Sequence, residues 1–177
     1  MLKIFTGWLI AAFLVLTAAP AIALPFSISP ASHGLVAQTM AKKSLFSFSG
    51  NRPATLGVKD GQVASCPGTP NCVSSQSPDS DAEHYIAPFS FSSSAPEAIA
   101  QIKGIIDGME LTSVIQQTDS YLYAEFSTPL MGFVDDVEFF ADASTGTVHV
   151  RSASRLGQSD LGVNRKRIEA LRAAFSA

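Results

Sequence analysis

The apolar residues in the second half of the chain are spaced as in a helix in two segments. Ser94 followed by Glu97 forms a capping box, which predicts the start of a helix, and Gly108 is expected to end it. The apolar face of this helix is formed by Ile99, Ile102, Ile105 and Ile106. A second helix is expected from about Leu161 to Phe175. One of its faces carries Asn164, Ile168, Leu171 and Phe175.

Between the two helices, apolar and polar residues alternate, which is typical of strands with one buried face. The four predicted strands are Met109–Gln117, Tyr121–Ser127, Phe133–Ala141 and Thr147–Ala153. A fifth strand is expected over Tyr85–Phe91, where Pro88 restricts it to a sheet edge. The order β-α-β-β-β-β-α predicts an α+β fold, in which two helices cover one face of an antiparallel sheet of four to five strands.

The N-terminal segment has the three parts of a secretory signal peptide. Lys3 supplies the positive charge, Trp8–Thr17 is an unbroken apolar run, and Ala21-Ile22-Ala23 is a cleavage site. We therefore expect a signal peptide over residues 1–23 and export to the periplasm or the thylakoid lumen. The alternative is an uncleaved membrane anchor over Ile4–Phe26, which is just long enough to span a bilayer.

Residues 24–61 have weak periodicity and are expected to be an irregular lead-in to a single α+β domain over residues 62–177. Within the lead-in, Leu45–Phe48 is interpreted either as a short strand or as a hydrophobic strap. The mature chain would contain 154 of the 177 residues, which is enough for one domain with a proper core. Loss of Lys3 would change the formal charge from −3 to −4, and this acidic balance argues against general nucleic-acid binding.

The chain contains two cysteines, Cys66 and Cys72, in a loop rich in Pro, Gly, Asn and Ser. In an exported chain this pair predicts a structural disulfide. Free thiols and metal binding are the alternatives, although two cysteines alone do not make a four-ligand zinc site. The loop is interpreted as a staple on an irregular segment, or as a binding surface of defined shape.

The acidic segment Phe133–Phe140 is expected to pair with Thr147–Ala153 in a hairpin. The register that keeps one face apolar places Val137 opposite Val150 and Phe139 opposite Val148. The same register places Asp136 opposite Arg151 and Glu138 opposite His149, as cross-strand pairs on a solvent-exposed face. The alternative is a metal site or an acid/base pair at these carboxylates.

The second helix begins with three cations, Arg165, Lys166 and Arg167, where the helix dipole disfavours positive charge. Its predicted N-cap is Ser159 or Asp160. Either acidic residues neutralise these cations internally, or an anionic ligand does so. The candidate cluster for either role is Asp135, Asp136, Glu138, Arg151, Arg155, Asp160, Asn164, Arg165 and Arg167.

Sequence signatures of common enzymes are missing from the chain. It has no Gly-x-Ser-x-Gly elbow, no His-Glu-x-x-His motif and no phosphate-binding glycine loop. His33, His84 and His149 have no metal-like spacing, so no metal and no cofactor are expected, and no catalytic residue is assigned. His149 is interpreted as a surface strand residue.

Four motifs together resemble the DUF1499 family, whose members have no established activity. They are Cys66-Pro-x-x-Pro-Asn-Cys72-Val-Ser-Ser75, Tyr121-x-Tyr-Ala-Glu-Phe126, Phe133-Val-Asp-Asp-Val-Glu-Phe139 and Arg151-Ser-Ala-Ser-Arg155 with the segment up to Glu169. The resemblance runs from about Ala64 to Arg172 and implies a bacterial or plastid-related protein.

The leading hypothesis is a non-enzymatic accessory or binding protein, whose partner is an anionic small molecule or another protein. The alternative is a hydrolase-like enzyme that acts on an anionic substrate at the Asp/Glu-Arg cluster. A third hypothesis is a membrane-associated assembly factor, in which the N-terminal segment is retained.

Export predicts a mature N-terminus at Leu24. The intact mass of the protein purified from its native compartment should lack residues 1–23. A mass that includes Met1–Ala23 would contradict cleavage and support the membrane anchor.

Overall fold

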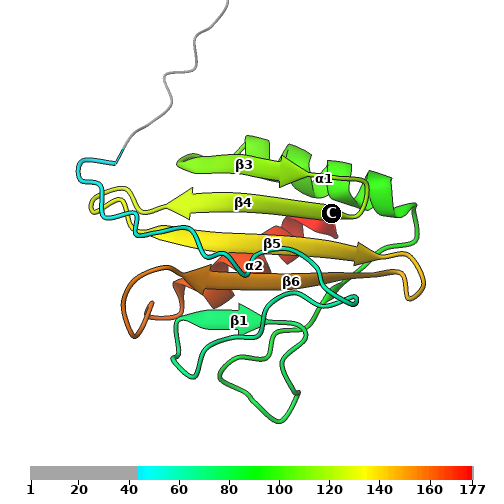
Figure 1. Cartoon of the computed structure of the whole chain (residues 1–177). Helices are drawn as coiled ribbons and strands as arrows, with labels where there is room; N and C mark the ends of the chain where they lie inside the picture. The colour runs from blue at the N-terminus through cyan, green and yellow to red at the C-terminus, as the bar shows by residue number, and fades with distance from the viewer. Residues whose placement is uncertain (1–43, 177) are drawn as a thin grey trace, which may run out of the picture. The chain divides into compact units, whose positions relative to one another are not determined.

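The computed structural model describes residues 44–176, which form one antiparallel sheet with two helices on one of its faces (Figure 1). The strands are β1 (Cys72–Ser74), β2 (Phe89–Ser90), β3 (Thr112–Gln117), β4 (Tyr121–Ser127), β5 (Val134–Asp142) and β6 (Thr147–Ser154). Their spatial order is β1-β6-β5-β4-β3, and β2 also pairs with β6. The predicted α+β class, the antiparallel sheet and the two helices are confirmed.

Helix α1 (Ala95–Asp107) begins as its sequence predicts. Ser94 is the N-cap, and its hydroxyl and the Glu97 carboxylate form the complete capping box. Gly108 ends the helix. The side chains of Ile99, Ile102 and Ile106 are buried against the sheet.

Helix α2 (Val163–Phe175) begins two residues later than predicted, and its N-cap is Gly162 rather than Ser159 or Asp160. Leu161 and Gly162 both have left-handed backbone angles, so the chain turns once more before the helix starts. Asp160 still serves the helix start, because its carboxylate accepts hydrogen bonds from the backbone N–H groups of Gly162 (2.9 Å) and Asn164 (2.7 Å). It therefore supplies the negative charge that this end of a helix favours.

Two short edge strands differ from the prediction. The segment containing Cys72–Ser74 has the composition of a loop, yet it pairs with β6 as β1. The strand expected over Tyr85–Phe91 is reduced to β2, with one isolated bridge between Tyr85 and Ser74. Both pairings depend on the free edge of β6, which local sequence does not reveal.

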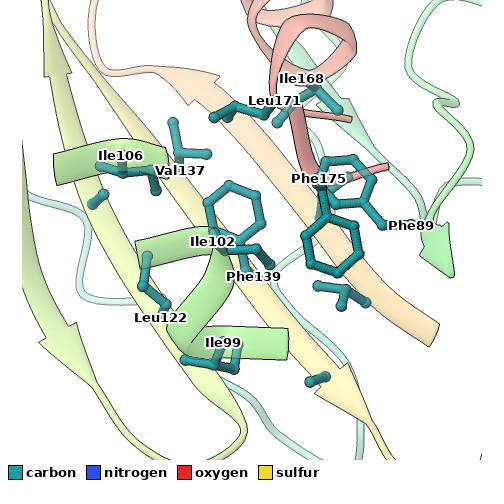
Figure 2. Packing of buried hydrophobic residues seen from close by; sticks show 14 of the residues in the cluster. Phe89, Ile99, Ile102, Ile106, Leu122, Val137, Phe139, Ile168, Leu171 and Phe175 are labelled. Atoms are coloured by element: carbon teal, nitrogen blue, oxygen red, sulfur yellow. The ribbon is translucent and has the colours of Figure 1, made fainter. Parts of the chain in front are cut away.

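The core lies between the sheet and the two helices (Figure 2). Phe139 of β5 is fully buried, and its ring centroid lies 6.2 Å from that of Phe89. Phe89 also contacts Phe175 of α2, with 5.5 Å between ring centroids. The guanidinium of Arg172 covers the Phe89 ring at 4.8 Å, so this charged residue closes the edge of the core.

The β5–β6 hairpin has the predicted faces but a different register. Phe139 lies opposite Val150 rather than Val148, and Glu138 lies opposite Arg151 rather than His149. Asp136 accordingly lies opposite Ala153, not Arg151. A shift of two residues leaves every side chain on the same face, so hydrophobic alternation could not distinguish the two registers. The turn sets the register, because Asp142 pairs with Thr147 and its carboxylate accepts a hydrogen bond from the Ser144 backbone N–H (2.9 Å).

The described part of the lead-in, residues 44–61, crosses the sheet face opposite the helices (Figure 1, cyan). Leu45–Phe48 is a strap rather than a strand. The backbone N–H groups of Leu45, Phe46 and Phe48 donate to the carbonyls of Pro129, Leu130 and Met131. Gly132 is needed for this approach, because a Cβ at this residue would lie 2.2 Å from the Phe46 carbonyl oxygen.

Candidate functional site

The sheet face beneath the lead-in is lined with polar and charged side chains from the three central strands. Alternation along β4 and β5 points Tyr121, Tyr123, Glu125, Asp136 and Glu138 to this face. Arg151 of β6 and Arg155, just after it, bring two guanidinium groups. The lead-in adds a third cation, Arg52. We call these eight residues the polar face.

Arg155 is the centre of the polar face. Its Nε donates to both carboxylate oxygens of Asp136 (2.9 and 3.1 Å), and Nη2 donates to Asp136 (2.6 Å) and to the Tyr123 hydroxyl (2.9 Å). A further ion pair joins Nη2 to Glu125. The side chains of Arg155 and Asp136 are only 5% and 1% exposed. The hydrogen bonds to Asp136 raise the pKa of Arg155 against the opposing effect of burial, so the cation is held firmly in its charged state.

Glu125 connects this pair to the lead-in. Arg52 donates to Oε1 of Glu125 from Nε (2.8 Å) and Nη2 (2.5 Å). Burial raises the pKa of Glu125, but hydrogen bonds from Arg155 and Arg52 outweigh it and lower the pKa overall. The Tyr123 hydroxyl lies 2.6 Å from Asp136 and 2.9 Å from Glu125, and burial raises the pKa of this phenol. The hydroxyl is therefore a neutral donor between two carboxylates.

Glu138 is fully buried and has donors on two sides. It accepts from the Tyr121 hydroxyl (2.8 Å), from the backbone N–H of Gly57 in the lead-in (2.8 Å), and from Nη1 of Arg151 at a longer 3.3 Å. Burial and the neighbouring Glu138 raise the pKa of Tyr121, so this phenol too stays protonated. Arg151 is less well satisfied than Arg155, because its buried Nε has no hydrogen-bond partner among residues 44–176.

The other sheet face has a separate polar group under α2. Arg167 donates to Asp135 (2.5 Å), to Asn164 (2.7 Å) and to the Ser152 hydroxyl (3.0 Å), and it stacks on Phe126 at 4.9 Å. The amide of Asn164 donates to the carbonyl of Asn71 (3.1 Å), which ties α2 to the disulfide loop. This group fixes the helix on the sheet.

Eight of the nine residues of the predicted cluster thus fall into two sets on opposite faces of the sheet. Asp136, Glu138, Arg151 and Arg155 belong to the polar face. Asp135, Asp160, Asn164 and Arg167 lie around the start of α2. Arg165 donates to the backbone carbonyls of Ala82 and Glu83 instead of to a carboxylate. Adjacent strand residues such as Asp135 and Asp136 point to opposite faces, which separates the sets.

Sequence analysis missed four members of the polar face: Arg52, Tyr121, Tyr123 and Glu125. The alternation Tyr-Leu-Tyr-Ala-Glu already places the last three on one face of β4, so the signal was present in the sequence. Arg52 had no signal, because it lies in an irregular segment and reaches Glu125 from 73 residues away. The predicted cross-strand pairs are not formed, and Asp136, Glu138 and Arg151 are buried rather than exposed, because the lead-in covers this face.

The disulfide loop forms a second candidate area. Cys66 and Cys72 are disulfide-bonded, as predicted. Beside the loop is a cavity of about 210 Å³ lined by residues from 62–68, by Ser74, and by Asp81 and His84. His84 Nδ1 lies 2.8 Å from the Asp81 carboxylate, and Nε2 lies 3.2 Å from the Thr69 carbonyl oxygen. Both ring nitrogens thus face hydrogen-bond acceptors, so His84 has a structural role in holding this loop.

His149 does not pair with Glu138. Its ring stacks on Phe140, with 6.1 Å between centroids, and is partly buried. Within residues 44–176, no three His, Cys, Asp or Glu side chains gather as a metal site would require. The same residues include no helix long and apolar enough to cross a bilayer. His33 and the predicted signal peptide lie outside the described residues.

The buried ion pair predicts a large loss of stability for Arg155→Met. Asp136 would remain buried with only the Tyr123 hydroxyl as a donor, which should cost about 3–5 kcal/mol of unfolding free energy. The matched control is Lys103→Met on α1, where an exposed pair with Asp107 is lost at a cost of no more than about 0.5 kcal/mol. Urea unfolding measures both. Equal, small losses would show that the Arg155 pair is not a stabilising contact.

The Asp81–His84 pair predicts a stability change near neutral pH. The hydrogen bond to Asp81 raises the pKa of His84, despite the opposing effect of burial. Since the pKa is raised in the folded state, the pair stabilises fully below the ordinary value of about 6.5, and this contribution is lost as the pH rises through the folded pKa. The unfolding free energy should therefore fall from about pH 6 to pH 8 more steeply in wild type than in Asp81→Asn.

NMR titration of the imidazole signals tests the assignment of this pH dependence to His84, because His149 serves as an internal control in the same sample. Burial lowers the pKa of His149, so this ring should titrate below 6.5 while His84 titrates above it. The reverse order would contradict the assigned hydrogen bonds.

Comparison with known proteins places the chain in a family without assigning it an activity. The model of the family described as "Protein of unknown function (DUF1499)" matches residues 62–175, from the disulfide loop to the end of α2. No curated protein and no solved structure matches the chain. The matched region covers well over half of the 177 residues, and the chain therefore belongs to the DUF1499 family.

Proposed function

We propose that this protein is a non-enzymatic accessory or binding domain that works after export, in the periplasm or the thylakoid lumen. The observation that supports this proposal best is that the carboxylates of the polar face are paired with arginines and covered by the lead-in. Each of these carboxylates is engaged by an arginine, and Arg52 and Gly57 of the lead-in lie over them.

A general acid or base must reach the substrate and exchange a proton near the working pH. Asp136 has three hydrogen bonds from Arg155 and is 1% exposed, and Glu138 is fully buried. A substrate would have to displace the lead-in before touching either carboxylate. These contacts favour a structural role for the cluster over the hydrolase-like alternative.

The disulfide supports the exported compartment, because such bonds persist in oxidising surroundings. It fastens a loop that has little regular structure of its own. Asn71 holds the same loop to the Gly157 carbonyl (2.8 Å), and Asn164 holds it to α2. These bonds hold the loop in a defined shape, which suits binding.

A thermal-shift titration with phosphate and sulfate tests this proposal. Wild type should show no saturable rise in melting temperature at constant ionic strength, whereas a ligand site would raise it by mass action. Arg155→Ala should melt roughly 10 °C or more below wild type, with or without the anions, because it breaks a buried pair.

The matched control is Arg165→Ala, which removes a cation that donates to the backbone carbonyls of Ala82 and Glu83, and it should melt close to wild type. A saturable stabilisation that disappears in an Arg155→Ala protein as stable as its parent would contradict the structural role of the cluster and favour an anion-binding site. Hydrolysis of p-nitrophenyl phosphate by wild type, abolished in Glu138→Gln, would favour the enzyme.

A further inference from the structure

The exposed large apolar side chains of the described chain gather at one end of the sheet. Nine of the ten within residues 44–176 lie in the strap, in the connections where β3 and β5 begin and β4 and β6 end, or at the first residue of α2. They are Leu45, Phe46, Phe48, Met109, Leu130, Phe133, Leu156, Leu161 and Val163. We call this surface the apolar end. The tenth, Ile115, lies within the edge strand β3.

The opposite end of the sheet has a different composition. Its tight connections are Thr118–Ser120 and Ala143–Gly146, which consist of small and polar residues and one aspartate. Figure 1 shows both ends, with the strap and the β4–β5 connection together at the left. The apolar residues are thus concentrated, whereas single exposed apolar side chains on a protein are usually scattered.

Backbone contacts build the apolar end. Three hydrogen bonds join the strap to the β4–β5 connection, and the rings of Phe48 and Phe133 pack with 6.0 Å between centroids. Leu156, which follows β6, lies against the lead-in at Gly50, two residues after the strap. A groove of about 410 Å³ opens between Phe46, Leu111 and Val134. The backbone contacts thus hold these apolar side chains exposed to solvent. The side chains thereby forgo the stabilisation that burial in the core would give.

Charged residues of both signs adjoin the apolar end: Glu110 and the partly buried Asp160 are acidic, and three lysines are basic. Ser44–Asn51 and Ser127–Val134 contain no charged residue. Lys42 and Lys43 immediately precede Ser44 in the sequence, and Lys166 is exposed in the first turn of α2. Lys166 sits where the helix dipole disfavours a cation, so a negative surface facing it would relieve this cost. The whole chain has a formal charge of −3.

The chain that precedes the domain enters at this same end, because Ser44 donates to the Thr128 carbonyl (2.6 Å). Upstream of Ser44 lies the apolar run Trp8–Thr17, which would meet a membrane during the proposed export. This apolar run is therefore joined to the domain at the apolar end.

From these observations we propose that the apolar end is a docking surface for a lipid bilayer that contains anionic phospholipids. The leucine and phenylalanine side chains enter the boundary between headgroups and acyl chains, and the lysines lie among the headgroups. This contact belongs to the domain itself and does not require the leader to be retained. The inference rests on the proposed function, because it names the partner of a binding domain.

Vesicle co-sedimentation tests the inference. Wild type should bind phosphatidylcholine vesicles that contain phosphatidylglycerol, bind pure phosphatidylcholine more weakly, and lose affinity as salt is added. All proteins compared have the same N-terminus, checked by intact mass, so any contribution of the leader cancels.

The decisive variant is the triple substitution Leu45→Ser, Leu130→Ser and Leu161→Ser. These side chains are 76%, 56% and 87% exposed, so the fold should tolerate their loss, and the melting temperature checks this. Binding should fall by about ten-fold or more. The matched control Ile115→Ser removes the exposed apolar side chain that lies away from the apolar end, and it should bind as wild type does.

The charge arm compares two exposed lysines. Lys166→Glu should weaken binding to the anionic vesicles, whereas Lys59→Glu, in the lead-in, should have little effect. Wild type that fails to bind any vesicle, or a folded triple variant that binds as well as wild type, would overturn the inference.

A second copy of the chain is the competing occupant. A wild-type dimer in analytical ultracentrifugation that the triple variant abolishes, without vesicle binding, would also overturn the inference. Vesicle binding reports on the apolar end, and the anion titration reports on the polar face. The inference and the proposed function can therefore fail separately.

Discussion

The carboxylate of Asp136 lies near the middle of the sheet, out of contact with water, and the guanidinium of Arg155 compensates its charge there. Transfer of a carboxylate from water costs several kcal/mol, which only good geometry and additional hydrogen bonds offset. The two Nε contacts, the Nη2 contact and the Tyr123 hydroxyl supply that geometry. The rest of the polar face is organised around this pair. Glu125, for example, forms ion pairs with both Arg155 and Arg52.

The sheet is therefore covered by two layers of different chemistry. On the helix side, α1 and α2 bury aliphatic and aromatic side chains, and Arg167 with Asn164 fixes the angle of α2. On the other side, the lead-in covers an ionic layer with Arg52 and Gly57. The family match begins at residue 62, so these two contacts come from chain outside the matched region. The lead-in nevertheless contributes directly to the folded domain.

The same lead-in connects the ionic layer to the apolar end. It begins in the strap, whose phenylalanines are exposed, and continues over Glu125 and Glu138 before it reaches the disulfide loop. Three hydrogen bonds to the β4–β5 connection and the close approach at Gly132 fix its start. One irregular segment thus closes the polar face and presents the apolar surface that we assign to a bilayer.

Local sequence determined the elements whose signals are short in range. The capping box at Ser94 and Glu97 started α1, and strict alternation marked β4, β5 and β6 and sorted their side chains between two faces. Cysteine spacing indicated the disulfide. These features depend on residues a few positions apart, so the sequence alone was sufficient for them.

Only the tertiary structure decided features that depend on distant segments. The hairpin register shifted by two residues because the turn at Asp142, not the apolar pattern, set the pairing. β1 formed because β6 had a free edge, and Arg52 met Glu125 because an irregular segment crossed the sheet. The carboxylates expected on the surface are buried and pair with other arginines than predicted, Asp136 with Arg155 and Glu138 with Arg151. Each of these outcomes depends on which segments meet in space, and neither periodicity nor composition carries that information.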